Sequence, residues 1–419
     1  MFLKLKQKIL NKTAKVSIIG VGYVGLAVTE TLLNSGLNII GYDTNADKIK
    51  DNQLLKTKNI KVTPNISEIK DCDVFVICLP TPVKQYVLPD FSFIENAFNN
   101  LAENVFKEGQ LVTIESTVQP GTTRDLIVPI ILNKKKNLRL GENFFIGYSP
   151  ERIDPASKHY TDLREIPKLI SGMTENCLLL TEIFYSQFIK NLYKTSSPEI
   201  AEFAKLFENT FRAINIAFVG EITRIANRLN MNIAEVLTAA YTKPFGIMPF
   251  WPTAGSGGHC IPVDLLYLDS WARTNDCYSQ FVELSHRINQ GTPYYIVQRV
   301  SKLLNEKSKS LKGSKILQIG ITYKPNVSDV RSSASLKLAE LLTDSEVELS
   351  VYDPYIKESD VNFKLMPNLT KQLLNDSDLV IFSVAHDCLD LDFIYKNSNC
   401  LFYCAGKPIF PNDKKINLL

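Results

Sequence analysis

The sequence lacks the features that mark several large classes of protein. Its eight cysteines include no C-x-x-C pair, so neither a zinc site nor a redox motif is indicated, and free thiols are expected. Its 47 basic and 44 acidic residues leave a net charge of only +3, which does not indicate the basic surface that a nucleic-acid-binding protein needs. We therefore expect no bound metal and no nucleic-acid partner.

Long apolar runs are also missing. The longest, such as residues 74–79, have the length of a strand and fall far short of the ~20 residues that a membrane-spanning helix requires. The first fifteen residues are basic with scattered Leu and Ile, and they lack the uninterrupted apolar core of a secretion signal. These absences predict a soluble, cytoplasmic protein without a membrane partner, and the length of 419 residues predicts two or three domains.

The N-terminal part has the pattern of a dinucleotide-binding fold. Residues 15–19 are typical of a strand, and residues 26–34 have helical spacing. Between them stand Gly20, Gly22 and Gly25, in the order G-x-G-x-x-G. We expect this loop to present backbone N–H groups and a helix N-terminus to a pyrophosphate.

Asp43 supplies a second element of that pattern. It follows a strand-like run, residues 38–42, and stands roughly 20 residues after the glycine loop, where such folds carry the acid that binds the adenosine ribose. This arrangement favours NAD over NADP because the carboxylate would repel a 2′-phosphate, although Lys48 would offset some of that repulsion.

Strand-like runs recur in both halves of the chain. They cover residues 74–79, 111–115 and 144–148 in the first half, and residues 315–320, 347–353 and 378–384 near the end. The two halves share an order, which pairs Gly20 with Gly320, Asp43 with Asp353 and Asp73 with Asp378. We therefore predict an α/β fold with two Rossmann-like, doubly wound parallel-sheet domains. The second lacks the glycine motif and is expected to bind no dinucleotide of its own.

A long helix is predicted between the two halves. From residue 200 to residue 229 apolar residues recur at intervals of three and four, and Gly220 is the only glycine or proline within this run. Such a helix would span ~45 Å, enough to join two domains and to offer an amphipathic face to a second copy of the chain. A homodimer or a higher homo-oligomer is expected.

The segment 255–264, GSGGHCIPVD, combines backbone freedom with a thiol and an acid. Glycines allow close approach of a ligand, and Cys260 can act as a nucleophile if a cation or a helix N-terminus favours its thiolate. The alternative is a buried cysteine beside a turn, which is what we expect for the other seven cysteines.

Three further groups stand where a site could be built. Lys205 and Asn209 lie four residues apart on the predicted helix, so they share a face and could jointly hold an oxyanion, or else be solvated. The runs 115–123 and 148–152 close strands with hydroxyl and charged side chains, as crevice residues of parallel sheets do. For the second run the alternative is an ion-paired loop.

Taken together and in this order, the motifs resemble the UDP-glucose/GDP-mannose dehydrogenase family over residues 16–331, with a weaker continuation to the end. The matching motifs are GVGYVG at 20–25, LPTP at 79–82, the 115–123 run, SPER at 149–152, Lys205 with Asn209, residues 257–264, and YK at 323–324 through DVR at 329–331. The chain departs from the family pattern at PTAG, residues 252–255, at Leu265 and at Lys407.

The resemblance implies an NAD-dependent oxidation of the C6 primary alcohol of a UDP-sugar to a carboxylate, in two rounds, through a thiohemiacetal and a thioester on Cys260. Covalent capture keeps the aldehyde bound between the two oxidations. The implied catalytic roles are oxyanion and water binding for Lys205, Asn209 and Asp264, general base catalysis for Glu151, and orientation of the water for Thr117. Surface polysaccharide precursors are the expected products.

The resemblance also implies binding residues and domains. For NAD the residues are Gly20, Gly22, Tyr23, Val24, Gly25, Asp43, Lys48, Pro80, Thr81, Ser116, Thr117 and Arg331. For the UDP-sugar they are Glu151, Arg152, Lys205, Asn209, Lys243, Phe250, Gly255, Gly257, Tyr323 and Lys324. The domains are an NAD-binding domain over residues 1–196, a central helical dimerisation domain with the Cys260 loop over 197–300, and a UDP-binding domain over 301–419.

Several functions stay open at the level of the sequence. SPER at 149–152 and TKPFG at 242–246 look more like the branch that acts on UDP-N-acetylhexosamines than like the branch that acts on UDP-glucose. One rival is a two-electron dehydrogenase of the hydroxyacid or phosphogluconate type, which needs no thiol. A third possibility is a catalytically idle homologue that binds NAD or a nucleotide sugar, and tight binding without turnover would favour it.

Overall fold

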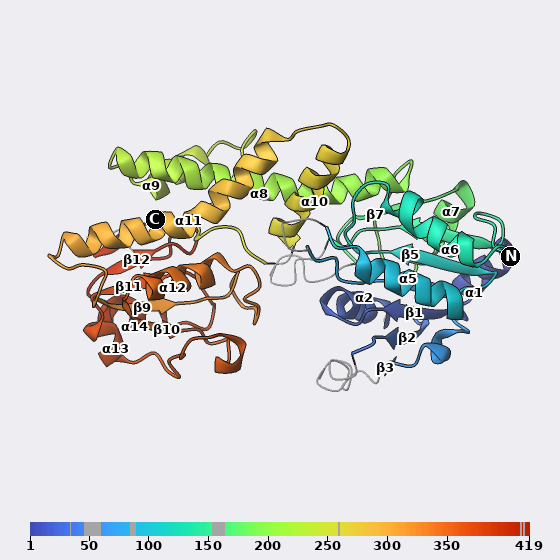
Figure 1. Ribbon diagram of the computed structural model, residues 1–419, viewed down its shortest axis with the longest axis horizontal. Helices are drawn as coiled ribbons and strands as arrows, with labels where there is room; N and C mark the ends of the chain where they lie inside the picture. Colours follow the sequence, from blue (N-terminus) through green and yellow to red (C-terminus); the bar gives the residue numbers. More distant parts are fainter. Residues whose placement is uncertain are drawn as a thin grey trace. The chain divides into compact units, whose positions relative to one another are not determined.

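The computed structural model describes residues 1–33, 35–45, 60–83, 89–152, 164–258, 260–410, 413 and 415–419, without the side chains of Tyr23, Cys260 and Ser359. The chain divides into two compact units (Figure 1). The first comprises Met1–Glu208 and Leu266–Asn275, and the second comprises Asn209–Leu265 and Asp276–Leu419.

The first unit is built on an eight-stranded sheet in the order β3-β2-β1-β4-β5-β6-β7-β8. Its strands are β1 (Lys15–Ile19), β2 (Asn38–Tyr42), β3 (Lys61–Thr63), β4 (Val74–Ile77), β5 (Gln110–Ile114), β6 (Phe144–Tyr148), β7 (Lys168–Gly172) and β8 (Leu192–Lys194). Neighbouring strands are parallel except β6 and β7, which are antiparallel. The carboxyl ends of β1, β2, β4, β5 and β6 therefore meet at one edge, where ligands bind in doubly wound folds.

Helices cover both faces of this sheet (Figure 1). They are α1 (Phe2–Leu10), α2 (Tyr23–Leu33), α5 (Ser92–Asn104), α6 (Val128–Lys134) and α7 (Glu175–Tyr185), with a short 3-10 helix, Ile66–Ile69, and a π-helix, Thr122–Ile127. In β4, Val74 and Val76 pack with α1, α2 and α7, whereas Phe75 and Ile77 pack with α5 and α6. Such alternation follows because successive strand residues point to opposite faces.

The second unit combines long helices with a parallel sheet. Its helical part contains the later turns of α8 (Pro198–Arg228), α9 (Ile233–Ala240), the first turn of α10 (Cys260–Thr274) and α11 (Gln280–Asn305). Its five strands have the order β10-β9-β11-β12-β13. They are β9 (Lys315–Ile319), β10 (Glu348–Tyr352), β11 (Leu379–Phe382), β12 (Leu401–Tyr403) and β13 (Ile416–Leu418).

The C-terminal sheet is also covered on both faces. Helices α11 and α12 (Ala334–Asp344) pack on one face through residues such as Ile296 and Leu338. Helices α13 (Lys371–Asp376) and α14 (Leu391–Asn397) pack on the other through Leu374 and Ile394, and a short 3-10 helix, Glu358–Asp360, follows β10. The predicted fold class, two doubly wound α/β domains with a long helix between them, is confirmed.

The two sheets repeat one hydrogen-bonding scheme at the residues that the sequence pairs. Gly20 N donates to Tyr42 O, and Gly320 N donates to Tyr352 O, each at 2.8 Å. The carboxylate of Asp43 accepts from Val21 N at 3.0 Å, and that of Asp353 accepts from Ile321 N at 2.8 Å. Asp73 and Asp378 likewise accept from the first residue of the central strand, Lys15 N or Lys315 N. The predicted internal repeat is therefore confirmed.

Some elements differ from the sequence-based expectation. Helix α2 begins at Tyr23 rather than residue 26, because its first turn belongs to the glycine loop and carries no apolar periodicity. Helix α1 was not predicted, although Leu5 and Ile9 lie four residues apart and are fully buried. The strand pair β7 and β8 was also missed, because a lysine begins β7 and only three residues form β8.

Three expectations concern bulk properties of the chain. None of the helices in the described part is both long enough and apolar enough to span a lipid bilayer. Among the described residues, no group of three or more His, Cys, Asp or Glu side chains is arranged to hold a metal ion. Cys277 and Cys388 are exposed, which corrects the expectation that every cysteine other than Cys260 is buried; both lie outside the regular helices and strands.

Candidate active site

The glycine loop joins β1 to α2, and each of its glycines meets a different steric requirement. Gly20 has φ +88°, and an added Cβ would lie 2.6 Å from the carbonyl oxygen of Cys78. An added Cβ at Gly25 would lie 1.9 Å from Gly20 O, whereas at Gly22 it would meet nothing within 4 Å. Open space at the second glycine, next to a helix N-terminus, is what a pyrophosphate needs, so the loop fits NAD.

Asp43 lies directly after β2 and beside this loop. Its carboxylate accepts hydrogen bonds from Val21 N at 3.0 Å and from Asn45 N at 2.9 Å, and the side chain is partly exposed. These bonds hold the acid at the loop while leaving acceptor capacity for ribose hydroxyls. Tyr23 and Val24 begin α2, but the side chain of Tyr23 is outside the described residues, as is the whole of Lys48.

The ends of β4 and β5 are tied together next to the glycine loop. Ser116 Oγ accepts from Leu79 N and donates to Leu79 O, both at 2.9 Å. Thr81 and Ser116 are buried, Thr117 is partly exposed, and Pro80 is exposed. Four of the residues predicted to bind NAD or to orient water thus stand at the same sheet edge as the glycines.

A buried ionic cluster lies one strand further along this edge. Lys168, at the start of β7, donates to a carboxylate oxygen of Glu115 at 2.8 Å, and its Nζ lies 4.0 Å from Oε2 of Glu151. Tyr185 donates to the other oxygen of Glu115 at 2.6 Å. Burial raises the pKa of Glu115 to about 7, against the lowering effect of Lys168. Burial disfavours charge on Lys168, but the carboxylates of Glu115 and Glu151 outweigh it and raise the pKa of Lys168.

Arg152 follows Glu151 and pairs with α8. Its guanidinium group binds the carboxylate of Glu208 through two nitrogens and donates to Pro167 O at 2.8 Å. This geometry matches the ion-paired loop that the sequence left as the alternative for residues 148–152. It fixes the backbone on the carboxyl side of Glu151.

Glu202 of α8 holds the segment that follows β5. Its carboxylate accepts from Gly121 N at 2.7 Å, from Thr123 N at 3.0 Å and from Thr123 Oγ1 at 2.6 Å, and the side chain is completely buried. Burial raises the pKa of Glu202 to about 7, and the hydrogen bonds oppose that rise. Glu202 therefore ties α8 to the segment that begins with Ser116 and Thr117.

Helices α8 and α10 carry the other predicted catalytic groups. Asn209 Nδ2 donates to Asp264 Oδ2 at 2.5 Å, and both side chains are buried in the second unit. Lys205, one turn before Asn209 on α8, is half-buried. Cys260 is the first residue of α10, but its side chain lies outside the described residues. The structure thus brings together Asn209 and Asp264, two groups that the sequence separates by 55 positions.

The glycine segment before Cys260 packs on the loop that follows β9. Gly258 N donates to Arg331 O at 3.1 Å. An added Cβ at Gly257 would lie 2.9 Å from Tyr323 Cβ, and at Gly258 it would lie 2.7 Å from the Tyr323 ring. Gly255, with φ +134°, leaves no room for a Cβ against Asn289 O, at 2.9 Å. Two motifs predicted to bind the UDP-sugar are therefore in direct contact.

Three other side chains that were predicted to bind ligands contact charged or aromatic side chains of this chain. Arg331 is exposed and donates to both carboxylate oxygens of Asp329, with bonds between 2.6 and 3.0 Å. Lys324 Nζ lies 5.5 Å from the ring centroid of Tyr323. Lys243 is exposed, with Nζ 4.8 Å from the ring centroid of Phe245.

Phe250 lies at the end of the segment that contains Lys243. It is partly buried, its backbone N–H donates to the hydroxyl of Tyr241 at 3.0 Å, and its ring centroid lies 6.3 Å from that of Phe211. These contacts place it against α8 and the end of α9.

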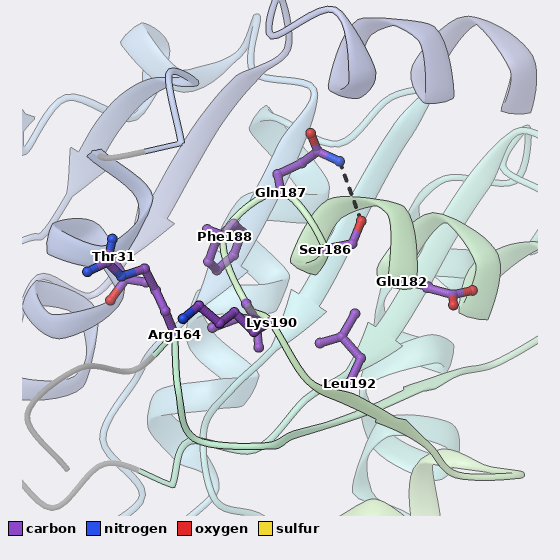
Figure 2. Close-up of a pocket in the computed structure, with 9 residues that line it drawn as sticks. Thr31, Arg164, Glu182, Ser186, Gln187, Phe188, Lys190 and Leu192 are labelled. Carbon is purple, nitrogen blue, oxygen red and sulfur yellow. Dashed lines mark hydrogen bonds between the residues drawn. The ribbon is translucent and has the colours of Figure 1, made fainter. Parts of the chain in front are cut away.

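A surface cavity of about 620 Å³ in the first unit is separate from these groups. It is lined by Thr31 of α2, Glu182 of α7, the residues 186–190 that follow α7, Leu192 and Arg164 (Figure 2). None of the residues predicted from the sequence to form the site lines it. This cavity therefore does not mark the candidate site.

Sequence reasoning missed Lys168, Tyr185 and Glu202. A signal for Lys168 was available, because a lysine between Pro167 and the apolar pair Leu169 and Ile170 is a charge within a strand, and buried charges are paired. Tyr185 and Glu202 stand on helices with ordinary amphipathic patterns. Only the packing reveals their roles.

Comparison with known proteins identifies the chain's relatives. Residues 51–195, 199–291 and 317–399 match the NAD binding, central and UDP binding domains of the UDP-glucose/GDP-mannose dehydrogenase family. The UDP-N-acetyl-D-glucosamine 6-dehydrogenase of Pseudomonas aeruginosa is 33% identical over 363 residues, which cover 83% of this chain and 85% of that protein. A UDP-N-acetyl-D-mannosamine dehydrogenase of Pyrococcus horikoshii is 31% identical, over 82% of this chain and 84% of that protein.

The fold agrees with that of a solved relative. The structure of the UDP-D-ManNAc dehydrogenase from Pyrococcus horikoshii superposes with a TM-score of 0.84, at 27% identity, over 96% of this chain and 98% of that one. The match extends over both α/β domains and the helices between them.

Proposed function

The chain belongs to the UDP-glucose/GDP-mannose dehydrogenase family and is an NAD-dependent nucleotide sugar 6-dehydrogenase, as its sequence predicts; we propose that it oxidises C6 of a UDP-N-acetylhexosamine to the carboxylate. The relatives named for UDP-N-acetyl-D-glucosamine and UDP-N-acetyl-D-mannosamine support this sugar class. One observation carries the proposal: the glycine segment that leads to Cys260 packs directly on Tyr323 and Arg331 of the C-terminal α/β domain. A nucleotide sugar held there would lie beside a thiol-bearing segment.

NAD, when bound, supplies the hydride acceptor for both oxidations. The residues that would hold it are the glycine loop, through backbone N–H groups at Gly22 and the start of α2, and Asp43, through hydrogen bonds from ribose hydroxyls. Pro80, Thr81 and Ser116 would form the adjoining wall at the ends of β4 and β5.

Cys260 would carry the substrate between the two oxidations. Its Sγ adds to the C6 aldehyde to form a thiohemiacetal, loss of the second hydride leaves a thioester, and water cleaves the thioester to the carboxylate and the free thiol. Cys260 begins α10, and the partial positive charge at a helix N-terminus stabilises a thiolate. The thiolate, being the attacking species, would be favoured by this position.

Five side chains would stabilise charge or move protons around that sulfur. Asn209, oriented by Asp264, and Lys205 would donate to the developing oxyanion, as preorganised donors do in acyl-transfer sites. Glu151 would accept the proton of the C6 hydroxyl and later that of the attacking water, with Thr117 orienting the water.

We further propose that the uronic acid product is a precursor of surface polysaccharides.

A homo-oligomer is the proposed working form. Phe211, Phe218 and Ile225 stand seven residues apart on α8, and each is at least 40% exposed. Side chains at that spacing share one helix face, and an apolar stripe of this kind is typical of an interface between copies. Sedimentation of Phe218→Glu against the unsubstituted protein tests this, and equal mass for the two would argue against the stripe.

The sugar is identified by turnover on a panel of UDP-sugars with NAD. We expect UDP-N-acetylglucosamine or UDP-N-acetylmannosamine to give the highest kcat/KM, with two NADH formed per sugar acid. Preference for UDP-glucose would place the chain in the other branch. A single NADH per product would indicate a two-electron dehydrogenase, and binding of UDP-sugars without turnover would indicate an idle homologue.

A further inference from the structure

Lys168 is fixed from several sides next to the proposed general base. It is 6% exposed, and its ammonium group donates to Glu115 at 2.8 Å and to the carbonyl oxygen of Pro150 at 3.3 Å. Pro150 immediately precedes Glu151, whose carboxylate lies 4.0 Å from the same nitrogen. One ammonium group thus binds the backbone before Glu151 and lies at ion-pair distance from its side chain.

Tyr185 and Glu115 constrain the position of Lys168 further. Tyr185 of α7 is completely buried, places its ring centroid 5.1 Å from Lys168 Nζ, and donates its hydroxyl hydrogen to Glu115 at 2.6 Å. Glu115 itself is 1% exposed. The groups that fix the ammonium position therefore come from three parts of the chain: Glu115 directly after β5, the segment that follows β6, and Tyr185 at the end of α7.

Charge balance sets this cluster apart from a structural ion pair. One buried ammonium group faces two buried carboxylates, and buried charges are retained at a net cost in stability unless the geometry and hydrogen bonding are very good. An apolar trio of similar volume would serve the fold as well. The cluster stands where β6 delivers Glu151 to the edge that carries the candidate site.

We propose that Lys168 is a positioning residue for Glu151: clamped by Glu115 and Tyr185, it orients the Glu151 carboxylate and supplies the positive charge that balances it. The inference rests on the proposed function, because Glu151 acts as a base only in that reaction. The proton released from the C6 hydroxyl adds to the Glu151 carboxylate through water and leaves to solvent before the next step. Glu115 anchors the clamp and does not touch the substrate.

Carbon-13 carboxyl spectra of glutamate-labelled protein test the coupling without any turnover. The Glu115 signal, assigned with Glu115→Gln, is expected to titrate near neutral pH, because burial raises the pKa of Glu115 to about 7. Glu151→Gln removes a negative neighbour and is expected to lower the Glu115 midpoint by about half a pH unit or more. An unchanged midpoint in Glu151→Gln would overturn the inference.

Kinetics then separate positioning from folding. The double variant Lys168→Met/Glu115→Gln removes the cation and its anchor together, so that no unpaired charge remains at Glu115. We expect kcat to fall by about tenfold or more, the loss typical of a misplaced general base, with KM for the UDP-sugar within about threefold of its original value. Lys168→Arg keeps the charge and should recover part of kcat.

The matched control is Lys190→Met, which removes an exposed lysine that pairs with the exposed Glu165. It should leave kcat, KM and the pH profile unchanged. If Glu151→Gln abolishes kcat but the double variant matches the control, the inference fails and the proposed function stands. If the unsubstituted protein oxidises no UDP-sugar, the proposed function fails, and the inference fails with it.

Discussion

Gly25 lies so close to Gly20 that an added Cβ at position 25 would come within 1.9 Å of the Gly20 carbonyl oxygen. The first turn of α2 can therefore pack on the glycine loop only if residue 25 has no side chain. Gly22, in the same loop, has open space at the corresponding point. The two glycines make separable predictions for folding and for cofactor binding.

Gly25→Ala is expected to lower the free energy of unfolding by about 2 kcal/mol or more, because backbone atoms must move to relieve the overlap. Gly22→Ala is expected to leave that free energy within about 1 kcal/mol, yet to weaken NAD binding about tenfold or more, since the methyl group would occupy the approach of the pyrophosphate. Urea denaturation and calorimetric titration with NAD measure the two effects. Unimpaired NAD binding in Gly22→Ala would contradict the assignment of the loop.

Lys168→Met is expected to destabilise the protein by about 3 to 5 kcal/mol, because it leaves the completely buried Glu115 without its ion-pair partner. Adding Glu115→Gln should recover most of that loss, since an amide can still accept a hydrogen bond from Tyr185. Denaturant midpoints of the two single variants and the double variant give the coupling free energy between Lys168 and Glu115. If the two changes in the free energy of unfolding are strictly additive, the ion pair contributes nothing to stability.

The sequence predicted those parts of the molecule in which local pattern and tertiary structure agree. Strands β1 and β2 have the predicted bounds, and the predicted long helix is displaced by two residues at one end and one at the other. The pairing of Asp43 with Asp353 was visible because each acid directly ends a strand-like run and comes next in order after a strand that ends at a glycine. An order of this kind survives in the sequence because the sheet requires it.

Other features depend on packing between segments that are distant in sequence. Lys168 and Glu115 are separated by 53 residues and Glu202 and Thr123 by 79, so no local pattern connects them. The short strand β8 and the amphipathic helix α1 carry too few residues to establish a period. Contacts between Gly258 and Tyr323 follow from a turn geometry that the letters G-S-G-G alone do not specify.

Glu202→Gln is expected to change how stability depends on pH. Burial raises the pKa of Glu202 from its ordinary value of 4.5 to about 7, so the folded state binds the proton more tightly than the unfolded state. This contribution to stability is complete below pH 4.5 and is lost as pH rises through 7. The Glu202→Gln variant has no such proton to lose. Over this pH range its free energy of unfolding should therefore fall by on the order of 3 kcal/mol less than that of the unsubstituted protein.

Urea unfolding of both proteins at several pH values between 4.5 and 7.5 measures the difference. The amide also loses the hydrogen bond from Gly121, but that loss is the same at every pH and displaces the whole curve. Parallel stability curves for the two proteins would mean that Glu202 does not hold its proton.

Gly257→Ala is expected to raise KM for the UDP-sugar about tenfold while KM for NAD changes little. The added Cβ would lie 2.9 Å from Tyr323 Cβ and 2.9 Å from Ser332 O, so the loop after β9 must shift. Gly220→Ala is the control, since a Cβ there meets nothing within 4 Å and alanine favours a helix by up to about 1 kcal/mol. Equal KM values for the two variants would contradict a nucleotide-sugar role for the Tyr323 loop.

Covalent capture by Cys260 is tested most directly by intact-protein mass spectrometry of enzyme quenched during turnover of its UDP-sugar with NAD. Covalent capture predicts an added mass equal to the UDP-sugar aldehyde for the thiohemiacetal, or to the UDP-sugar acid less one water for the thioester. The adduct should map by peptide analysis to Cys260 and be absent from Cys260→Ser. Cys260→Ser should also form no sugar acid. Full formation of the acid by Cys260→Ser, with no adduct on the unsubstituted protein, would contradict it.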